Sequence, residues 1–137
     1  DYFKNYAYDP RLVVIDDMSL GDIKNKPGMD AVMQSHYIEF VEGRFQHQSK
    51  EIYKKYGEFD FVWFDCGGSK DYEDFLNEYW FLCSGYIFFH FTYSNGIPNQ
   101  NLKTILSTIA NEPFRIDVIE PHKKRQGSIT IIKKQVT

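Results

Sequence analysis

The chain has 137 residues, of which 42% are hydrophobic and 26% are charged, and this length and balance predict one globular domain with its own core. A formal charge of −3 excludes the positive field typical of nucleic-acid-binding proteins, so we expect no nucleic-acid partner. The sequence contains no apolar run of membrane-spanning length, no recognisable leader and no CxxC pair, so we expect a soluble, cytoplasmic protein with no membrane partner.

Hydrophobic periodicity gives the predicted elements in chain order. Alternating or continuous apolar runs indicate strands, spacing of three and four residues indicates helices, and Gly, Pro and Asn mark the turns between them. These patterns predict the end of a helix at residues 1–8, a strand at 11–15, a helix at 29–35, a strand at 37–41, a helix at 49–56, a strand at 59–64, a helix at 69–82, a strand at 86–89, a helix at 101–110, and strands at 114–119 and 128–132.

The most informative stretch is the apolar run at residues 59–64, which ends in Asp65 and is followed by Gly67 and Gly68. A near-continuous apolar run, here with Asp60 as its one polar residue, is typical of a strand whose sheet is covered by helices on both faces. Because strands alternate with helices along most of the chain, we predict an α/β fold with a doubly wound, mostly parallel, Rossmann-like sheet. The last two strands are expected to pair antiparallel across the basic loop at residues 122–125.

Polar side chains follow several of the predicted strands. Asp16 and Asp17 follow the first strand, Asp65 follows the strand at residues 59–64, and His90 follows the strand at 86–89. Ligands of open α/β sheets bind beyond the carboxyl ends of the strands. A carboxylate there can accept both hydroxyls of a ribose, and His90 can serve as a general base near neutral pH. Each group also has a purely structural interpretation: Asp65 as a helix cap, the acids as turn residues, and His90 as a donor to a backbone carbonyl.

Four segments in this order resemble the class I S-adenosylmethionine-dependent methyltransferases, most closely the O-methyltransferase branch. They are Ile15 and Asp16, residues 41–46, residues 59–65 and residues 85–90. The resemblance covers nearly the whole chain and implies a single methyltransferase-like domain over residues 1–137, with a reversed C-terminal strand in its sheet. It implies methyl transfer from S-adenosylmethionine to an oxygen or nitrogen acceptor on a small molecule or sugar.

The resemblance also implies residue roles. Asp16, with Asp17 as the second choice, would bind the ribose of the cofactor. The turn at Gly43 would lead to Phe45 and Gln46, which would contact the adenine. Asp65 would lie beside the methyl donor as both a cofactor-binding and a catalytic residue, and His90 would face the acceptor as the catalytic base.

Two departures from the family pattern leave alternatives open. The family's first strand and Gly-rich cofactor turn have no counterpart before Asp1, so the N-terminal part is truncated, either in a fragment or in a reduced domain. Phe91 stands where metal-dependent members have an acid, so we assign no metal site. A non-catalytic binding or assembly module is the alternative function, and a dinucleotide-dependent reductase ranks last because it needs the same absent glycines.

The partner predictions follow from the same residues. An enzyme of this kind needs a small-molecule substrate, and a sheet edge exposed by a missing strand would favour a homo-oligomer. The chain also has twelve Phe, ten Tyr and two Trp residues, which suit either an aromatic core or a partner surface. The basic loop at residues 122–125 is read first as a solvated turn and second as a phosphate or RNA contact.

Overall fold

The computed structural model describes residues 11–20, 25–122 and 128–135, and the chain divides into two compact units, Asp1–Phe45 and Gln46–Thr137. The predicted helix end at residues 1–8 and most of the basic loop lie outside the described residues.

The first unit contains a small parallel sheet. Strands β1 (Leu12–Asp16) and β2 (Ile38–Glu42) pair in register, so that Asp16 lies opposite Glu42 at their carboxyl ends. Helix α2 (Met29–Met33) lies in the connection between them, starting after Gly28, whose φ of 92° suits glycine. The helix predicted at residues 29–35 is therefore confirmed over Met29–Met33.

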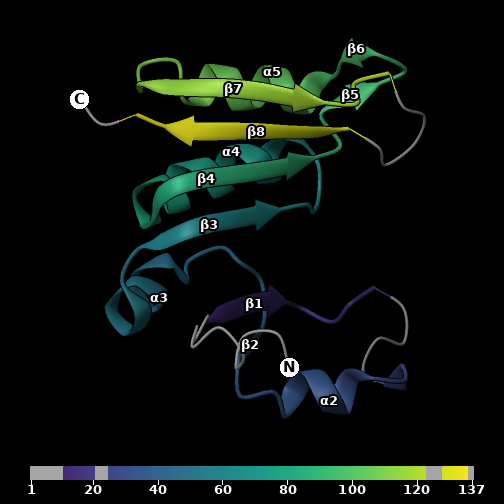
Figure 1. Cartoon of the computed structure of the whole chain (residues 1–137), viewed down its shortest axis with the longest axis vertical. Helices are drawn as coiled ribbons and strands as arrows, with labels where there is room; N and C mark the ends of the chain where they lie inside the picture. Colours follow the sequence, from purple (N-terminus) through teal and green to yellow (C-terminus); the bar gives the residue numbers. More distant parts are fainter. Residues whose placement is uncertain (1–10, 21–24, 123–127, 136–137) are drawn as a thin grey trace, which may run out of the picture. The chain divides into compact units, whose positions relative to one another are not determined.

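The second unit is built on a four-stranded sheet (Figure 1). The order is β3-β4-β8-β7, in which β3 and β4 are parallel while β8 runs antiparallel to both β4 and β7. A short hairpin, β5–β6, turns at Asn95 and Gly96, which both have positive φ, as two-residue hairpin turns require. The strands are β3 (Phe59–Phe64), β4 (Cys83–His90), β5 (Tyr93–Ser94), β6 (Ile97–Pro98), β7 (Phe114–Ile119) and β8 (Ile129–Lys134).

Helices α4 (Ser69–Tyr79) and α5 (Gln100–Thr108) lie on the same side of this sheet (Figure 1). Helix α3 (Ser49–Tyr56) precedes β3 and buries Ile52, and a 3₁₀ turn, Trp80–Leu82, joins α4 to β4. The helices and the covered face of the sheet form the core, whose buried side chains include Phe64, Tyr72, Phe75, Leu76, Ile87, Phe89, Leu102, Ile105 and Ile132.

The predicted doubly wound, mostly parallel Rossmann-like sheet is wrong. The described strands form three small sheets, and three of their five pairings are antiparallel. The prediction failed because the apolar run at β3 does not reflect burial on both faces: Phe64 is buried against the helices, whereas Phe61 and Trp63 are exposed on the other face. The predicted antiparallel pairing of the last two strands is confirmed.

Candidate functional site

Asp65 and His90 lie side by side where the parallel strands β3 and β4 end. Strand β3 ends at Phe64 and strand β4 ends at His90, and the two strands are in register up to Phe64 and Phe89. The His90 Nδ1 atom is 3.4 Å from the Asp65 Oδ2 atom, and the side chains are 11% and 38% exposed. An ionised carboxylate only accepts hydrogen bonds, so this contact favours the tautomer with the proton on Nδ1 and places the basic lone pair on Nε2.

The backbone around His90 is fixed by side chains from both helices of the core. The hydroxyl of Tyr72 on α4 donates a 2.6 Å hydrogen bond to the His90 carbonyl oxygen. Phe91 has a positive φ of 56°, and its carbonyl oxygen accepts from Asn99 Nδ2 at 2.7 Å and from Asn101 Nδ2 at 3.0 Å. These bonds hold the His90 ring, which lies 5.9 Å from the Trp63 ring between centroids, at the end of β4.

Asp65 does not cap the helix that follows it. The backbone N–H of Gly68 donates instead to Asp71 Oδ2 at 2.9 Å, so Asp71 in the first turn satisfies the helix start. Gly67 has a φ of 73°, and a Cβ at this position would collide with the Asp71 side chain. Gly67 is thus required by the tight turn onto α4, and the Asp65 carboxylate is left to pair with His90.

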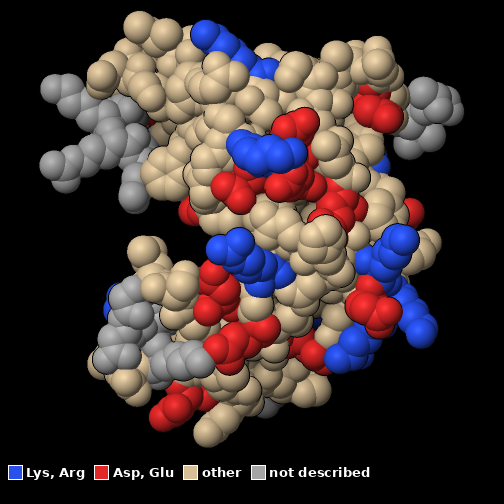
Figure 2. All heavy atoms as spheres, turned by 180° about the vertical axis from the view of Figure 1, so that it is seen from behind, with Lys and Arg blue, Asp and Glu red and all other residues tan. Residues whose placement is uncertain are grey.

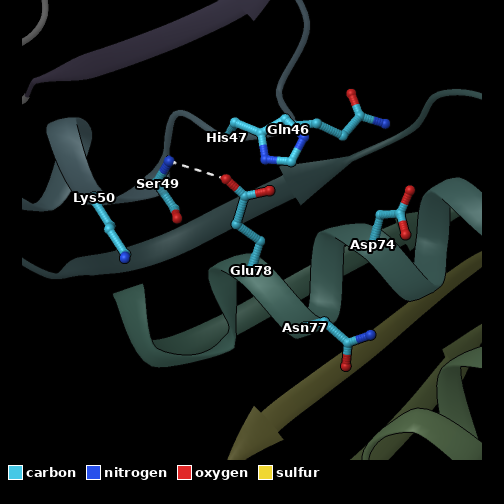
Figure 3. A pocket seen from close by; sticks show the side chains of 7 residues that line it. All are labelled: Gln46, His47, Ser49, Lys50, Asp74, Asn77 and Glu78. Carbon is cyan, nitrogen blue, oxygen red and sulfur yellow. Dashed lines mark hydrogen bonds between the residues drawn. The ribbon is translucent and has the colours of Figure 1, made fainter.

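Gln46 lies at the edge of an open polar pocket of about 550 Å³ (Figure 3). Its Nε2 atom donates to Asp71 Oδ1 at 3.3 Å, and the backbone N–H of Ser49 donates to Glu78 Oε1 at 3.2 Å across the same pocket. The pocket is lined by Gln46, His47, Ser49, Lys50, Asp74, Asn77 and Glu78.

Charges of both signs are interspersed on the face seen in Figure 2. On α4, Lys70 Nζ lies 2.8 Å from Asp74 Oδ1 and 3.3 Å from Glu73 Oε2. The hydrogen bonds to Asp74 and then to Glu73 raise the pKa of Lys70. Because its carboxylates are engaged by Lys70 and by the Ser49 backbone, the pocket suits a polar ligand better than a strongly charged one.

The other predicted cofactor residues belong to the first unit. The Asp16 Oδ1 atom accepts from the Met18 backbone N–H at 2.7 Å, and the Gly43 N–H donates to the Asp16 carbonyl oxygen at 2.9 Å. Phe45, which ends this unit, is half-buried.

The Asp17 side chain stabilises the turn that follows β1. Its Oδ1 atom accepts from the Ser19 hydroxyl at 2.6 Å and from the Ser19 N–H at 3.0 Å, and Arg44 Nε lies 4.0 Å from Oδ2. The hydroxyl bond from Ser19, followed by its backbone bond, lowers the pKa of Asp17. Asp16 is the last residue of β1 and Asp17 follows it, and both already accept bonds within their turns.

The structure brings together Asp65 and His90, and it joins Asp16 to the Gly43 turn, each pair within one unit. The sequence interpretation missed Tyr72, Asn99 and Asp71, which support the site. Asn99 and Asp71 had a usable signal, since each is a residue type favoured at a helix start. Tyr72 had none, because its bond to His90 spans 18 residues.

Comparison with known proteins finds no family model that matches the sequence and no matching curated protein. Within the part of the chain that the structure describes, no cluster of three or more His, Cys, Asp or Glu side chains is placed to hold a metal ion. None of the described helices is long and apolar enough to span a membrane.

Proposed function

We propose that this protein is an S-adenosylmethionine-dependent methyltransferase whose acceptor is an oxygen, or a nitrogen, on a small molecule or sugar. The observation that carries the proposal is the pairing of His90 with Asp65 at the carboxyl ends of two neighbouring parallel strands. Such a position is where α/β proteins bind their ligands, and such a pair is how proteins orient a histidine base.

In this proposal His90 removes the proton from the acceptor. Asp65 holds the Nδ1–H, so that Nε2 receives the proton from the acceptor hydroxyl or amine. Asp65 also keeps the ring oriented through this contact. His90 is buried, which limits the competition from water.

S-adenosylmethionine, when bound, supplies the electrophilic methyl group. Each of the two units offers side chains whose chemistry suits one part of that cofactor. Asp17 is an exposed carboxylate whose lowered pKa keeps it ionised, and Asp16 stands beside it at the end of β1. Ionised carboxylates accept the two hydroxyls of a ribose. Gln46 offers an amide toward an adenine edge, with its Nε2 atom bonded to Asp71. For the methionine part, the sequence has no Gly-rich turn.

A non-catalytic binding module is the second candidate function. The exposed rings of Phe61 and Trp63 on the uncovered face of the sheet favour it, because aromatic residues are enriched at protein interfaces. The two candidates differ in cofactor binding, which the module does not need.

The test is formation of S-adenosylhomocysteine by the full chain with a panel of phenols, catechols, amines and sugars. We expect His90→Gln to lower turnover by about 100-fold or more, as removal of a general base does, with the affinity for S-adenosylmethionine nearly unchanged. His36→Gln, which changes an exposed histidine in the first unit, is the control and should keep full turnover. Equal turnover of His90→Gln and wild type would remove His90 from the base role.

A further inference from the structure

The sheet of the second unit has one face covered by helices and one face that carries exposed rings. Helices α4 and α5 lie behind the sheet in Figure 1, and they cover Phe64, Ile87 and Phe89. Side chains alternate between the two faces of a strand, so the intervening residues of β3 and β4 point away from the helices. Of these, Phe61 is 50% exposed, Trp63 46% and Tyr86 41%.

These rings form a continuous apolar surface, to which we give the name open face. The Phe88 ring lies 4.5 Å from Phe61 and stacks on Trp63 at 6.4 Å between centroids, and the Tyr86 ring lies 6.4 Å from Phe88. Contiguous exposed apolar surface of this kind usually marks an interaction site.

The strand register divides the open face into two rows. Val62, Ile87, Ile132 and Ile116 are aligned across the four strands, and by alternation they point toward the helices. The open-face residues therefore lie one position before or after this line on each strand. One row holds Phe61, Tyr86, Lys133 and Arg115, and the other holds Trp63, Phe88, Ile131 and Asp117.

We infer that the open face is the interface at which a second copy of this chain binds to form a two-fold dimer. A two-fold axis along the line between the rows exchanges one row with the other. Phe61 of one copy then meets Trp63 of the second copy, and Tyr86 meets Phe88. Two twisted sheets that pack face to face in this way cross at roughly 30°.

The two rows carry three charged side chains, of which Arg115 and Asp117 are complementary under the same rotation. The third, Lys133, has its Nζ atom 5.3 Å from the centre of the Tyr86 ring of its own copy. Arg115 and Asp117 are exposed neighbours on β7, with Arg115 Nη2 3.7 Å from Asp117 Oδ2. The axis places Arg115 of each copy opposite Asp117 of the other, outside the aromatic centre. Interfaces between copies have this arrangement of an apolar core and a polar rim.

A nucleic acid stacked on the rings fits the open face less well. Stacking platforms for nucleic acids need a positive surface along the backbone path. Here the two rows carry Arg115 and Lys133 against Asp117, which leaves a single excess positive charge, and the chain as a whole carries a formal charge of −3. A face that carries both signs at its rim favours its own copy.

Sedimentation velocity of the full chain over a concentration series tests the interface. We expect a dimer for wild type and an increase of about 30-fold or more in the dimer dissociation constant for Trp63→Glu, as for a hot-spot residue. Phe81→Glu is the matched control, because Phe81 is also 46% exposed but lies in the 3₁₀ turn before β4. Its dissociation constant should equal that of wild type.

Charge reversal provides a second test that does not touch the rings. Arg115→Asp and Asp117→Arg should each weaken the dimer, because each creates like charges across the axis, and the double variant should restore it. The inference would be overturned if the wild-type chain stayed monomeric up to about 100 µM, because the affinity of the dimer would then be too low for a specific interface. A dimer unaffected by Trp63→Glu, or one lost equally in Phe81→Glu, would overturn it as well. Should Trp63→Glu fail to fold, the exposed charge variants decide the question.

Discussion

Tyr72 links the core of the second unit to the candidate site, and its hydroxyl can be removed without removing its ring. The side chain is fully buried, and its ring meets Phe64 edge to face at 5.0 Å. Its hydroxyl donates to the carbonyl oxygen of His90 at 2.6 Å. The substitution Tyr72→Phe keeps the aromatic packing and removes only this bond.

We expect Tyr72→Phe to lower the free energy of unfolding by about 1–2 kcal/mol at pH 7, since a buried carbonyl oxygen loses its donor. Burial, with a smaller contribution from Asp65, also raises the pKa of Tyr72 above the ordinary value of 10.0. The unfolded state therefore releases this proton first as the pH rises. Wild type should lose about 1.4 kcal/mol of stability for each pH unit above about 10 through this group, and the variant should not.

Above about pH 10 the loss of stability in wild type offsets the hydrogen bond that the variant lacks. The difference in free energy of unfolding between wild type and Tyr72→Phe should therefore shrink to near zero at about pH 11. Urea unfolding followed by circular dichroism at pH 7, 9, 10.5 and 11 measures it. Tyr53→Phe, at an exposed position on α3, is the control and should match wild type throughout. Equal stability of Tyr72→Phe and wild type at pH 7, or a gap that stays constant to pH 11, would refute the reasoning.

Two further substitutions test how β4 and α5 are held. Gly85→Ala should lower the free energy of unfolding by about 2–3 kcal/mol, because the added Cβ would collide with the Asp60 carbonyl oxygen. Gly68→Ala is the control: its Cβ meets nothing within 4 Å, so this variant should unfold at nearly the wild-type urea concentration. Similar losses of stability in both variants would contradict this packing. Asn99→Ala should lower the free energy of unfolding, measured with urea, by about 1–2 kcal/mol. The reason is that the Asn99 side chain accepts from the Asn101 and Leu102 N–H groups and donates to the Phe91 carbonyl oxygen. Asn99→Asp keeps the acceptor and should lose less, and an Asn99→Ala chain as stable as wild type would argue against the cap.

Local patterns predicted the elements because each records burial over a few residues. The apolar positions of α5 follow helical spacing, and Leu102 and Ile105 are indeed its buried residues. The predicted helix at residues 69–82 is confirmed as α4 followed by a 3₁₀ turn. The hairpin β5–β6 was expected only as a loop, since two-residue strands leave too little alternation to detect.

The sheet arrangement could not be predicted from the same patterns. The run at β3 is apolar on both faces, which is also the pattern of a strand covered on both sides. Its aromatic residues are instead divided between the core, at Phe64, and the open face, at Phe61 and Trp63. The sheet is mixed because β4 pairs antiparallel with β8, a strand about 40 residues further along the chain.

The candidate site was predicted in part. Asp65 and His90 could be identified because each follows an apolar strand, and their contact requires only that the two strands be parallel neighbours. The residues that fix them could not, because Tyr72 and Asn99 reach the end of β4 through side-chain bonds to backbone carbonyls that no local pattern records.

The most direct test of the proposed function is a calorimetric titration of S-adenosylmethionine into the folded full chain. We predict binding that Asp16→Ala weakens by about 10-fold or more, as the loss of a charged hydrogen-bond partner does, and that Asp30→Ala, an exposed acid on α2 of the same unit, leaves unchanged. The absence of heat from a chain whose circular dichroism shows it folded, or equal affinities for wild type and Asp16→Ala, would contradict the proposal.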